Sequence, residues 1–190
     1  LMNWTVTVGG FVAKLDGKAV NCYSESSVSV NVDTSSRGKP AYVGGFVGSL
    51  TGEVEHCYFN GNVSCANATR YVQIYIGGFV GKAGTDTETA VIRSSFFLGN
   101  VTANGGTRRW CGIFIGISTN ATLNDIYYDN NAELTASEIG TSYTTECTDG
   151  RAQEPTRLKS VQWLISELGF DGNFWTEEFG LPVLKSFALT

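Results

Sequence analysis

The sequence predicts an all-β protein, a right-handed parallel β-solenoid (β-helix) of about four coils with a small C-terminal cap that contains a helix. Three observations lead to this fold class. A block of the type Val-Gly-Gly-Phe-Val recurs four times, the recurring units are rich in Val, Ile, Phe, Tyr and Thr, and no unit contains ten residues with the apolar periodicity of a helix. The predicted hand follows from the crossover rule for parallel strands.

The repeat period defines the domain organisation. The repeated phenylalanines are Phe11, Phe46, Phe79 and Phe114, so successive units are 35, 33 and 35 residues apart. We expect the solenoid to occupy residues 1–134, with units at about 1–35, 36–68, 69–103 and 104–134, and the cap to occupy residues 135–190. A propeller blade would need about four antiparallel strands in roughly 40 to 45 residues and its own signature, which is absent.

The repeats predict stacked ladders of side chains, because equivalent residues of a solenoid lie about 4.8 Å apart from coil to coil. The four phenylalanines form one expected core ladder. A second block in each unit predicts another core ladder, made of Tyr23, Tyr58, Phe96 and Tyr127. Glycine pairs such as Gly44–Gly45 are expected to form corners or to let one coil pass close to its neighbour.

The residues after the repeats predict a helix at about 156–168. Its apolar face consists of Leu158, Val161, Leu164, Ile165 and Leu168, with Pro155 near its start and Gly169 just past its end. We expect this helix and the aromatic-rich residues 170–187 to lie across the exposed end of the last coil, because an uncovered strand edge is prone to pairing. An independent small binding domain is the alternative.

The N-terminal end is expected to be open, because nothing amphipathic precedes the first Gly-Gly-Phe block. Two partners could cover such an edge. Upstream repeats of the same polypeptide are one, and a neighbouring subunit stacked head to tail is the other, which would propagate a filament.

The second unit combines Gly44-Gly45-Phe46-Val47-Gly48 with His56-Cys57-Tyr58 and Gly61-Asn62-Val63. This order resembles the GLUG motif, and the tail Phe174-Trp175 followed by Gly180-Leu181-Pro182-Val183-Leu184 resembles the end of proteins in that family. The match is close in unit two, good in units one and three, and degraded in unit four. The resemblance implies a β-solenoid from large bacterial surface proteins, which include adhesin-like proteins and non-catalytic parts of immunoglobulin A peptidases. It carries no catalytic residues.

Composition excludes several partners and cofactors. The net charge is -5 and no basic run exists, so we expect no nucleic-acid partner. No apolar stretch approaches the roughly 20 residues that a membrane span needs. The five cysteines form no Cys-x-x-Cys pair and His56 is the only histidine, so we expect no metal and no cofactor.

Cys22 and Cys57 occupy equivalent positions in adjacent units, and we expect them to stack, either as thiols or as a bridge. Five Asn-x-Ser/Thr triplets indicate an extracellular, cell-surface glycoprotein, and a bacterial β-protein with chance triplets is the open alternative. They begin at Asn3, Asn62, Asn67, Asn100 and Asn120. Asn62 and Asn100 are expected to mark one outward face, and Asn67 and Asn120 to lie in loops.

Few residues are candidates for catalysis. His56 and Cys57 are adjacent in a predicted strand and would point to opposite faces, so they cannot act as a couple. The cap residues Asp171, Glu177 and Glu178 could imitate a glycosidase carboxylate pair, but we expect them to be solvated turn residues. Acidic stretches around Asp86, Glu88 and 129–131 lack the spacing of a calcium loop.

The sequence therefore predicts a non-catalytic extracellular module, structural or adhesive, that forms a rigid segment of a larger surface protein or of a fibre. Two alternatives remain open. One is a carbohydrate-active, pectinase-like β-solenoid, and the other is a spacer in a large peptidase. A glycan or protein ligand of the adhesive module would have to come from the host, and the sequence does not identify it.

Overall fold

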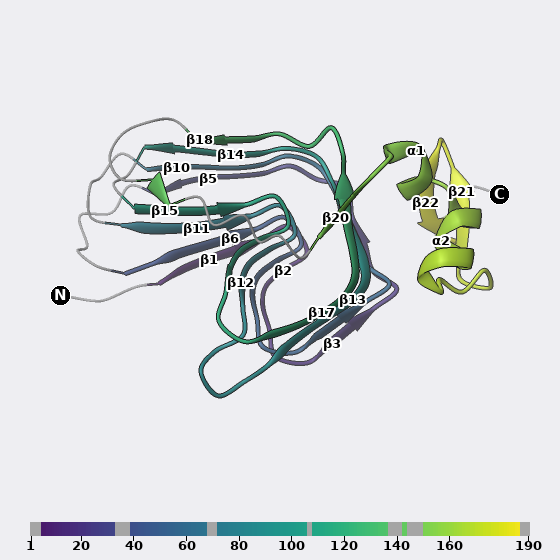
Figure 1. Cartoon of the computed structure of the whole chain (residues 1–190), viewed down its shortest axis with the longest axis horizontal. Coiled ribbons are helices and arrows are strands. Elements are labelled where there is room, and N and C mark those ends of the chain that lie inside the picture. The colour runs from purple at the N-terminus through teal and green to yellow at the C-terminus, as the bar shows by residue number, and fades with distance from the viewer. Residues whose placement is uncertain are drawn as a thin grey trace.

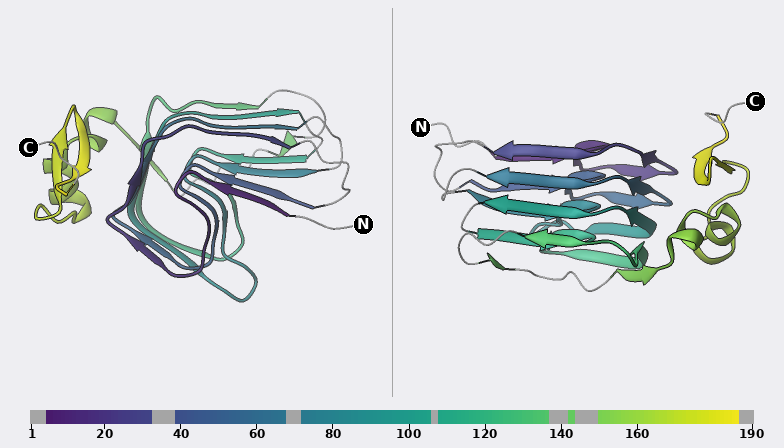
Figure 2. Two further views of the ribbon diagram at one scale, coloured as in Figure 1. Left: turned by 180° about the vertical axis from the view of Figure 1, so that it is seen from behind. Right: turned by 90° about the horizontal axis from the view of Figure 1, so that it is seen from above.

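The computed structural model describes residues 5–32, 39–67, 72–105, 108–136, 142–143 and 150–186. It confirms the predicted all-β fold, a solenoid of mostly parallel strands (Figure 1). In Figure 1 the chain runs counterclockwise around each coil while successive coils approach the viewer, so the solenoid is right-handed. Figure 2 shows the coils stacked from the side.

Each coil contributes strands to four sheets, named A to D here. Sheet A contains β1 (Val6–Gly9), β6 (Ala41–Gly44), β11 (Gln73–Gly77), β15 (Arg108–Gly112) and β19 (Ser142–Tyr143). Sheet B contains β2 (Val12–Leu15), β7 (Val47–Leu50), β12 (Val80–Ala83) and β16 (Ile115–Ser118).

Sheet C contains β3 (Lys18–Val20), β4 (Tyr23–Ser24), β8 (Glu53–Glu55), β9 (Tyr58–Asn60), β13 (Ala90–Leu98), β17 (Ala121–Asp129) and β20 (Arg151–Gln153). Sheet D contains β5 (Val28–Val32), β10 (Val63–Asn67), β14 (Val101–Gly105) and β18 (Leu134–Ala136). We refer to β1–β5 as coil 1, β6–β10 as coil 2, β11–β14 as coil 3 and β15–β18 as coil 4.

The strand register follows the sequence repeat, since Val8 pairs with Val43 and Val43 with Ile76. Neighbouring coils approach closely at the glycine pairs. A Cβ atom added at Gly45 would lie 2.1 Å from the carbonyl oxygen of Gly78, which no real Cβ atom tolerates. Glycine is therefore needed there so that the coils can stack.

The phenylalanine ladder runs along the interior, with Phe46, Phe79 and Phe114 buried and Phe11 exposed at its first end. The ring centroids are 4.5 Å apart for Phe11–Phe46, 4.9 Å for Phe46–Phe79 and 4.7 Å for Phe79–Phe114, and all three pairs are stacked. A further interior pair, Phe59–Phe97, comes from sheet C with a centroid distance of 6.2 Å. Burying rings of this size stabilises the fold by roughly 2 to 3 kcal/mol each.

Sheet C bends at one equivalent residue in every coil. These residues have left-handed backbone conformations, with φ values of 53° at Asn21, 51° at His56, 46° at Ser94 and 50° at Asp125. Asn, Asp and His adopt this conformation more readily than other residues that carry a Cβ atom. The repeat of polar residues at this position thus has a backbone reason.

The C-terminal segment, residues 155–186, contains α1 (Pro155–Leu158), α2 (Val161–Leu168) and a hairpin of β21 (Trp175–Glu178) and β22 (Leu181–Leu184). It therefore has two helices where the sequence led us to expect one over about 156–168. The side chain of Ser160 caps α2 by accepting a hydrogen bond from the Trp163 N–H, which starts a new helix. Pro155 is the first residue of α1, and Gly169 ends α2 with a φ of 69°.

The C-terminal segment lies beside the solenoid rather than across its end, which corrects the expected position (Figure 2). It covers the tyrosine-rich ladder, in which Tyr23–Tyr58 and Tyr58–Phe96 stack as predicted with ring centroids 5.1 and 4.9 Å apart. This ladder faces outward from sheet C and forms a second core with the segment, rather than part of the solenoid interior. The ring contacts are Trp163–Tyr127, Phe170–Phe96, Trp175–Tyr58 and Trp175–Tyr23, with centroid distances from 5.5 to 6.2 Å. This apolar strip runs along all four coils, and the segment removes it from water.

Candidate functional site

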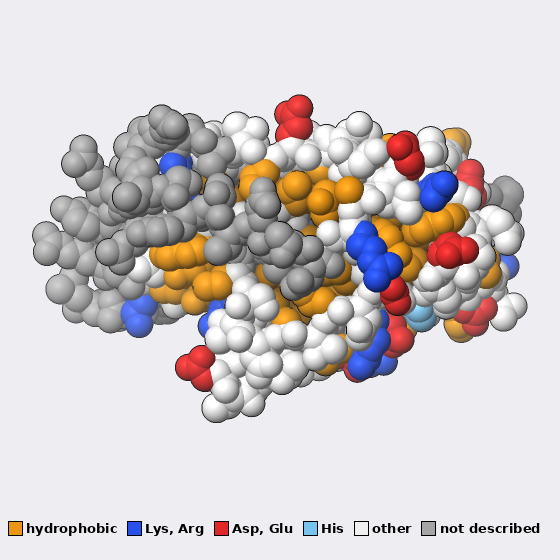
Figure 3. Space-filling view, in the orientation of Figure 1, with side chains coloured by type: hydrophobic (Ala, Val, Ile, Leu, Met, Phe, Trp, Pro, Cys, Tyr) orange, Lys and Arg blue, Asp and Glu red, His pale blue; other side chains and the backbone are white. Residues whose placement is uncertain are grey.

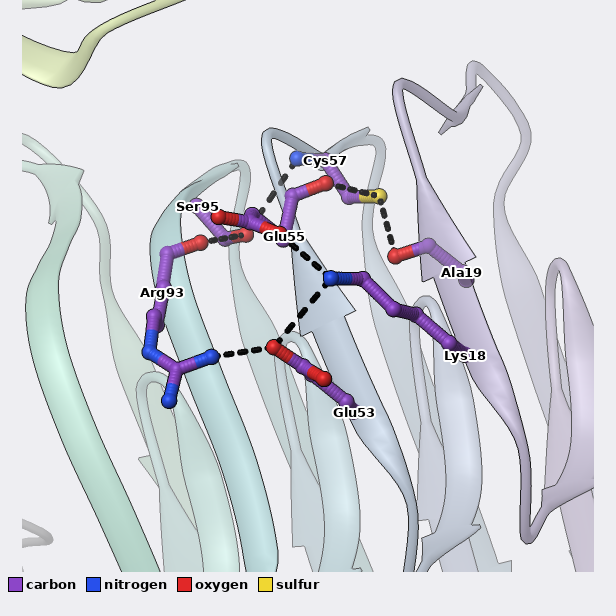
Figure 4. A network of polar contacts seen from close by, with 7 residues as sticks. All are labelled: Lys18, Ala19, Glu53, Glu55, Cys57, Arg93 and Ser95. Atoms are coloured by element: carbon purple, nitrogen blue, oxygen red, sulfur yellow. Dashed lines mark hydrogen bonds and ion pairs between the residues drawn. The ribbon is translucent and has the colours of Figure 1, made fainter.

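The outer face of sheet C carries a network of charges that crosses three coils (Figure 4). The Lys18 ammonium of coil 1 lies 2.7 Å from Glu55 Oε2 and 3.4 Å from Glu53 Oε1, both in coil 2. Glu53 also pairs with the Arg93 guanidinium of coil 3. Figure 3 shows acidic and basic side chains gathered beside the single histidine, where the solenoid meets the C-terminal segment.

The pKa values in this network shift in the directions that the pairing requires. The hydrogen bond from Lys18 holds the pKa of Glu55 below its usual range, and the same bond raises the pKa of Lys18. All of these side chains are partly or largely exposed, so the network orders the surface more than it stabilises the fold. Its carboxylates are held by cations, an arrangement that fits coil-to-coil pairing.

The bend of sheet C separates His56 from Cys57. The His56 ring packs against Phe170 of the C-terminal segment at a centroid distance of 5.1 Å, whereas Cys57 is buried in the interior. The two side chains therefore do not meet as a catalytic couple. In coil 3 the place of Cys57 is taken by Ser95, whose hydroxyl accepts a hydrogen bond from the Cys57 N–H.

Cys22 and Cys57 lie next to one another as free thiols in adjacent coils, and the Cys22 N–H donates to Cys57 Sγ at 3.4 Å. Hydrogen bonding by the Cys57 thiol lowers the pKa of Cys22 to about 7, while burial raises the pKa of Cys57. Burial likewise raises the pKa of Cys65 to about 12 and that of Cys111 to about 11. Cys147 lies outside the described residues.

The outer face of sheet A carries an aromatic ladder that the sequence reasoning missed. Tyr42 and Tyr75 have ring centroids 5.3 Å apart, and Tyr75 stacks on Trp110 at 4.5 Å. Lys82, from sheet B, places its ammonium 5.2 Å from the centroid of the Tyr42 ring. All four side chains are half-buried. The signal was available, because each aromatic residue stands two positions before the first glycine or its equivalent in the repeated block.

Two of the five glycosylation candidates, Asn62 and Asn100, are exposed in equivalent turns of coils 2 and 3. The Asn62 side chain accepts a hydrogen bond from the Asn100 N–H at 3.0 Å, and the Asn100 side chain accepts one from the Glu133 N–H at 2.8 Å. In both cases the side-chain oxygen is the acceptor, which leaves the amide nitrogen as the group that could carry a glycan. Asn120 is half-buried in a turn before β17. Asn3 and the Asn67 side chain lie outside the described residues.

The remaining acidic candidates do not converge. Asp171 accepts a hydrogen bond from the Asn173 N–H within its own turn, and Glu177 and Glu178 lie in β21 rather than in a turn. Asp86 and Glu88 are exposed in the loop before β13. Within the described residues, no group of three or more His, Cys, Asp or Glu side chains could hold a metal ion. In the same residues, no helix is both long enough and apolar enough to span a membrane.

Comparisons with known proteins agree with this architecture. Residues 40–64 match the GLUG motif, so the second repeat is a GLUG repeat. The chain is also similar to the crystal structure of a proposed immunoglobulin A1 protease from Bacteroides ovatus, with a TM-score of 0.65 and 19% identity, over 95% of this chain and 54% of that one. The chain thus spans about half of that protein, and the likeness shows the fold alone. Among the curated proteins, none matches the sequence.

Proposed function

We propose that the chain is a non-catalytic structural module, a rigid solenoid segment of a longer extracellular surface protein. The observation that carries this proposal is that the repeated side chains pair from coil to coil. The phenylalanines stack along the axis, and Lys18, Glu53 and Arg93 connect three successive coils. Residues used in this way build a rod rather than a pocket.

Two alternatives are separated by direct assays. A carbohydrate-active solenoid needs carboxylates that converge in a groove, and here the sheet C carboxylates are paired with cations. The likeness to a proposed immunoglobulin A1 protease favours a spacer of a large peptidase as the second candidate. We expect the purified chain to cleave neither pectin and related polysaccharides nor immunoglobulin A1. Cleavage of either substrate would contradict the non-catalytic role, and the flanking gene sequence would identify a peptidase spacer.

The adhesive part of the proposal rests on the sheet A ladder. Tyrosine and tryptophan combine a large apolar area with a polar group, and they are enriched at interfaces. Binding of the chain to arrays of host glycans and extracellular proteins would test it. The variant Tyr75→Ser with Trp110→Ser is expected to lose any binding, and Asp86→Asn, in the exposed loop before β13, to retain it. Binding that survives the double substitution would assign adhesion to another surface.

The glycoprotein part of the proposal is tested at Asn62 and Asn100. Expression in a eukaryotic secretory host should add glycans there, which intact-mass spectrometry detects. Asn62→Gln and Asn100→Gln should each remove one of them. A bare polypeptide mass from that host would count against the glycoprotein assignment.

A further inference from the structure

Each pair of neighbouring coils is joined by the same interface. The face of coil 1 that points away from coil 2 presents this interface again, without a coil to cover it. In every sheet the strand at this end, β1, β2, β3 or β5, is the last of its row among the described residues. Phe11 is 45% exposed, whereas Phe46 and Phe79 are fully buried. Val8, Val12 and Cys22 are likewise more exposed than their equivalents in coil 2.

The hydrogen bonds identify what this end lacks. The carbonyl oxygen of Phe46 accepts two N–H groups from the preceding coil, those of Phe11 and Val12. The carbonyls of Phe79 and Phe114 accept the equivalent pairs from coils 2 and 3. No such pair of donors reaches the carbonyl of Phe11 from the described residues. The missing groups are thus the two backbone N–H donors of a Phe-Val pair, or of a similar pair, in a coil that precedes coil 1.

We propose that this end of the solenoid binds one further coil of the same Gly-Gly-Phe type, supplied by a preceding repeat of a longer polypeptide. The inference rests on the proposed function and names the partner of the rod. A second copy stacked head to tail is a poorer occupant, because the far end is partly covered by the chain itself, where β19 and β20 pair with the last coil in sheets A and C. There Phe114 is 1% exposed, and Gly150 lies against Phe114 and Tyr128.

The C-terminal segment extends the proposed surface. An open cleft of about 390 Å³ lies beside the bend of coil 1 and is lined by Asn21, Asn173, Phe174, Leu184, Lys185 and Ser186. Phe174 is 53% exposed there, and Trp175 Nε1 donates to Asn21 Oδ1. Bends stack on one another, since the Asn21 N–H donates to the Glu55 carbonyl and the His56 N–H to the Arg93 carbonyl. The bend of an added coil would therefore stack on Asn21, next to this cleft.

A grafted coil tests the proposal. Both Val6 and Ile74 pair with Ala41, so a copy of residues 41–73 joined directly to Val6 preserves the register. Cys57→Ser and Cys65→Val in the copy keep Cys22 as the reporter thiol. We expect maleimide labelling of Cys22, located by peptide mapping, to slow by more than about tenfold, because labelling would then require the interface to open. Amide exchange in the added coil should slow as well.

The matched control is the same extension with Phe46→Asp in the copy, which should leave Cys22 as reactive as in the original chain. Unchanged labelling of Cys22 in the graft, with exchange as fast as in the control, would overturn the proposal. If the original chain self-associates in sedimentation experiments, and if Cys22 is protected from labelling in the associated form, the choice of partner would be overturned. Either result leaves the cleavage assays, and therefore the non-catalytic role, untouched.

Discussion

Coil 1 and coil 4 are built from the same sequence block but have opposite environments. Phe11 and Phe114 occupy equivalent positions, yet their exposed fractions are 45% and 1%. Coil 4 is covered because β19 and β20 add a partial turn beyond it and Gly150 packs against Phe114. Coil 1 has no described chain beyond it. The energetic role of a repeated residue thus depends on which neighbours its coil has, and not on its identity alone.

The largest expected effect of this difference is on the phenylalanine ladder. Phe46→Ala should lower the free energy of unfolding by roughly 3 to 5 kcal/mol, because it leaves a cavity among fully buried rings. Phe11→Ala should cost only about 1 kcal/mol, since much of that ring is already exposed. Urea unfolding measures both values. Equal losses of unfolding free energy for the two variants would mean that Phe11 is buried to the same extent as Phe46.

The thiols offer a second comparison. Cys22 is half-exposed with a pKa of about 7, whereas Cys57 is buried with a raised pKa. We expect Cys22 to react with iodoacetamide at least about tenfold faster than Cys57 at pH 7, because the thiolate is the nucleophile. The Cys22 rate should rise to half its maximum near pH 7. Equal rates for the two residues would show that coil 1 is as closed as coil 2.

A smaller effect is expected where the C-terminal segment meets the outer ladder. The Tyr58 hydroxyl is buried and donates to the Pro182 carbonyl. Tyr58→Phe should therefore cost roughly 0.5 to 1.5 kcal/mol in thermal or urea unfolding. Tyr23→Phe, in the more exposed coil 1, is the matched control and should change stability by less. A larger loss of stability for Tyr23→Phe than for Tyr58→Phe would indicate that the hairpin is anchored at coil 1 instead.

The smallest effect concerns the charge network that begins on coil 1. The pKa of Glu55 is lowered by Lys18, so its contribution to stability is present above its unfolded value, near 4.5, and is lost as the pH falls through the lowered folded value. Because Glu55 and its partner Lys18 are both partly exposed to solvent, Glu55→Gln should cost less than about 1 kcal/mol at pH 7. The difference from wild type should vanish once the pH lies below the lowered folded pKa of Glu55. If the stability difference between Glu55→Gln and wild type persists at that low pH, it arises from packing rather than from charge.

The repeat allowed much of the solenoid to be predicted, because one period fixes the register of every sheet at once. The phenylalanine ladder follows directly, since Phe46 and Phe79 must stack if Val43 and Ile76 pair. The outward direction of Tyr58 could not be obtained from strand alternation. The left-handed residue His56 interrupts that alternation, and its polar character alone does not reveal its φ.

The C-terminal segment was harder to place for a related reason. Its helical face was identified correctly as apolar, because Leu158, Leu164 and Leu168 are all buried. The break at Ser160 was hidden, since the apolar spacing from Leu158 to Val161 suits one continuous helix as well as two. The sequence pattern shows that the apolar face of the helices must be covered. It does not show whether the end of the solenoid or the outer ladder of sheet C covers that face.

The return of the C-terminal segment along the outside of sheet C also changes how the molecule must come apart. A solenoid without such a segment can unfold one coil at a time from either end, because each coil contacts only its neighbours. Here Trp175 binds Asn21, and the two residues are 154 positions apart in the chain. The first coil cannot separate from the solenoid without breaking this contact with the C-terminal segment. The segment therefore couples the coils into a single cooperative unit, which melts in one transition rather than fraying from its open end.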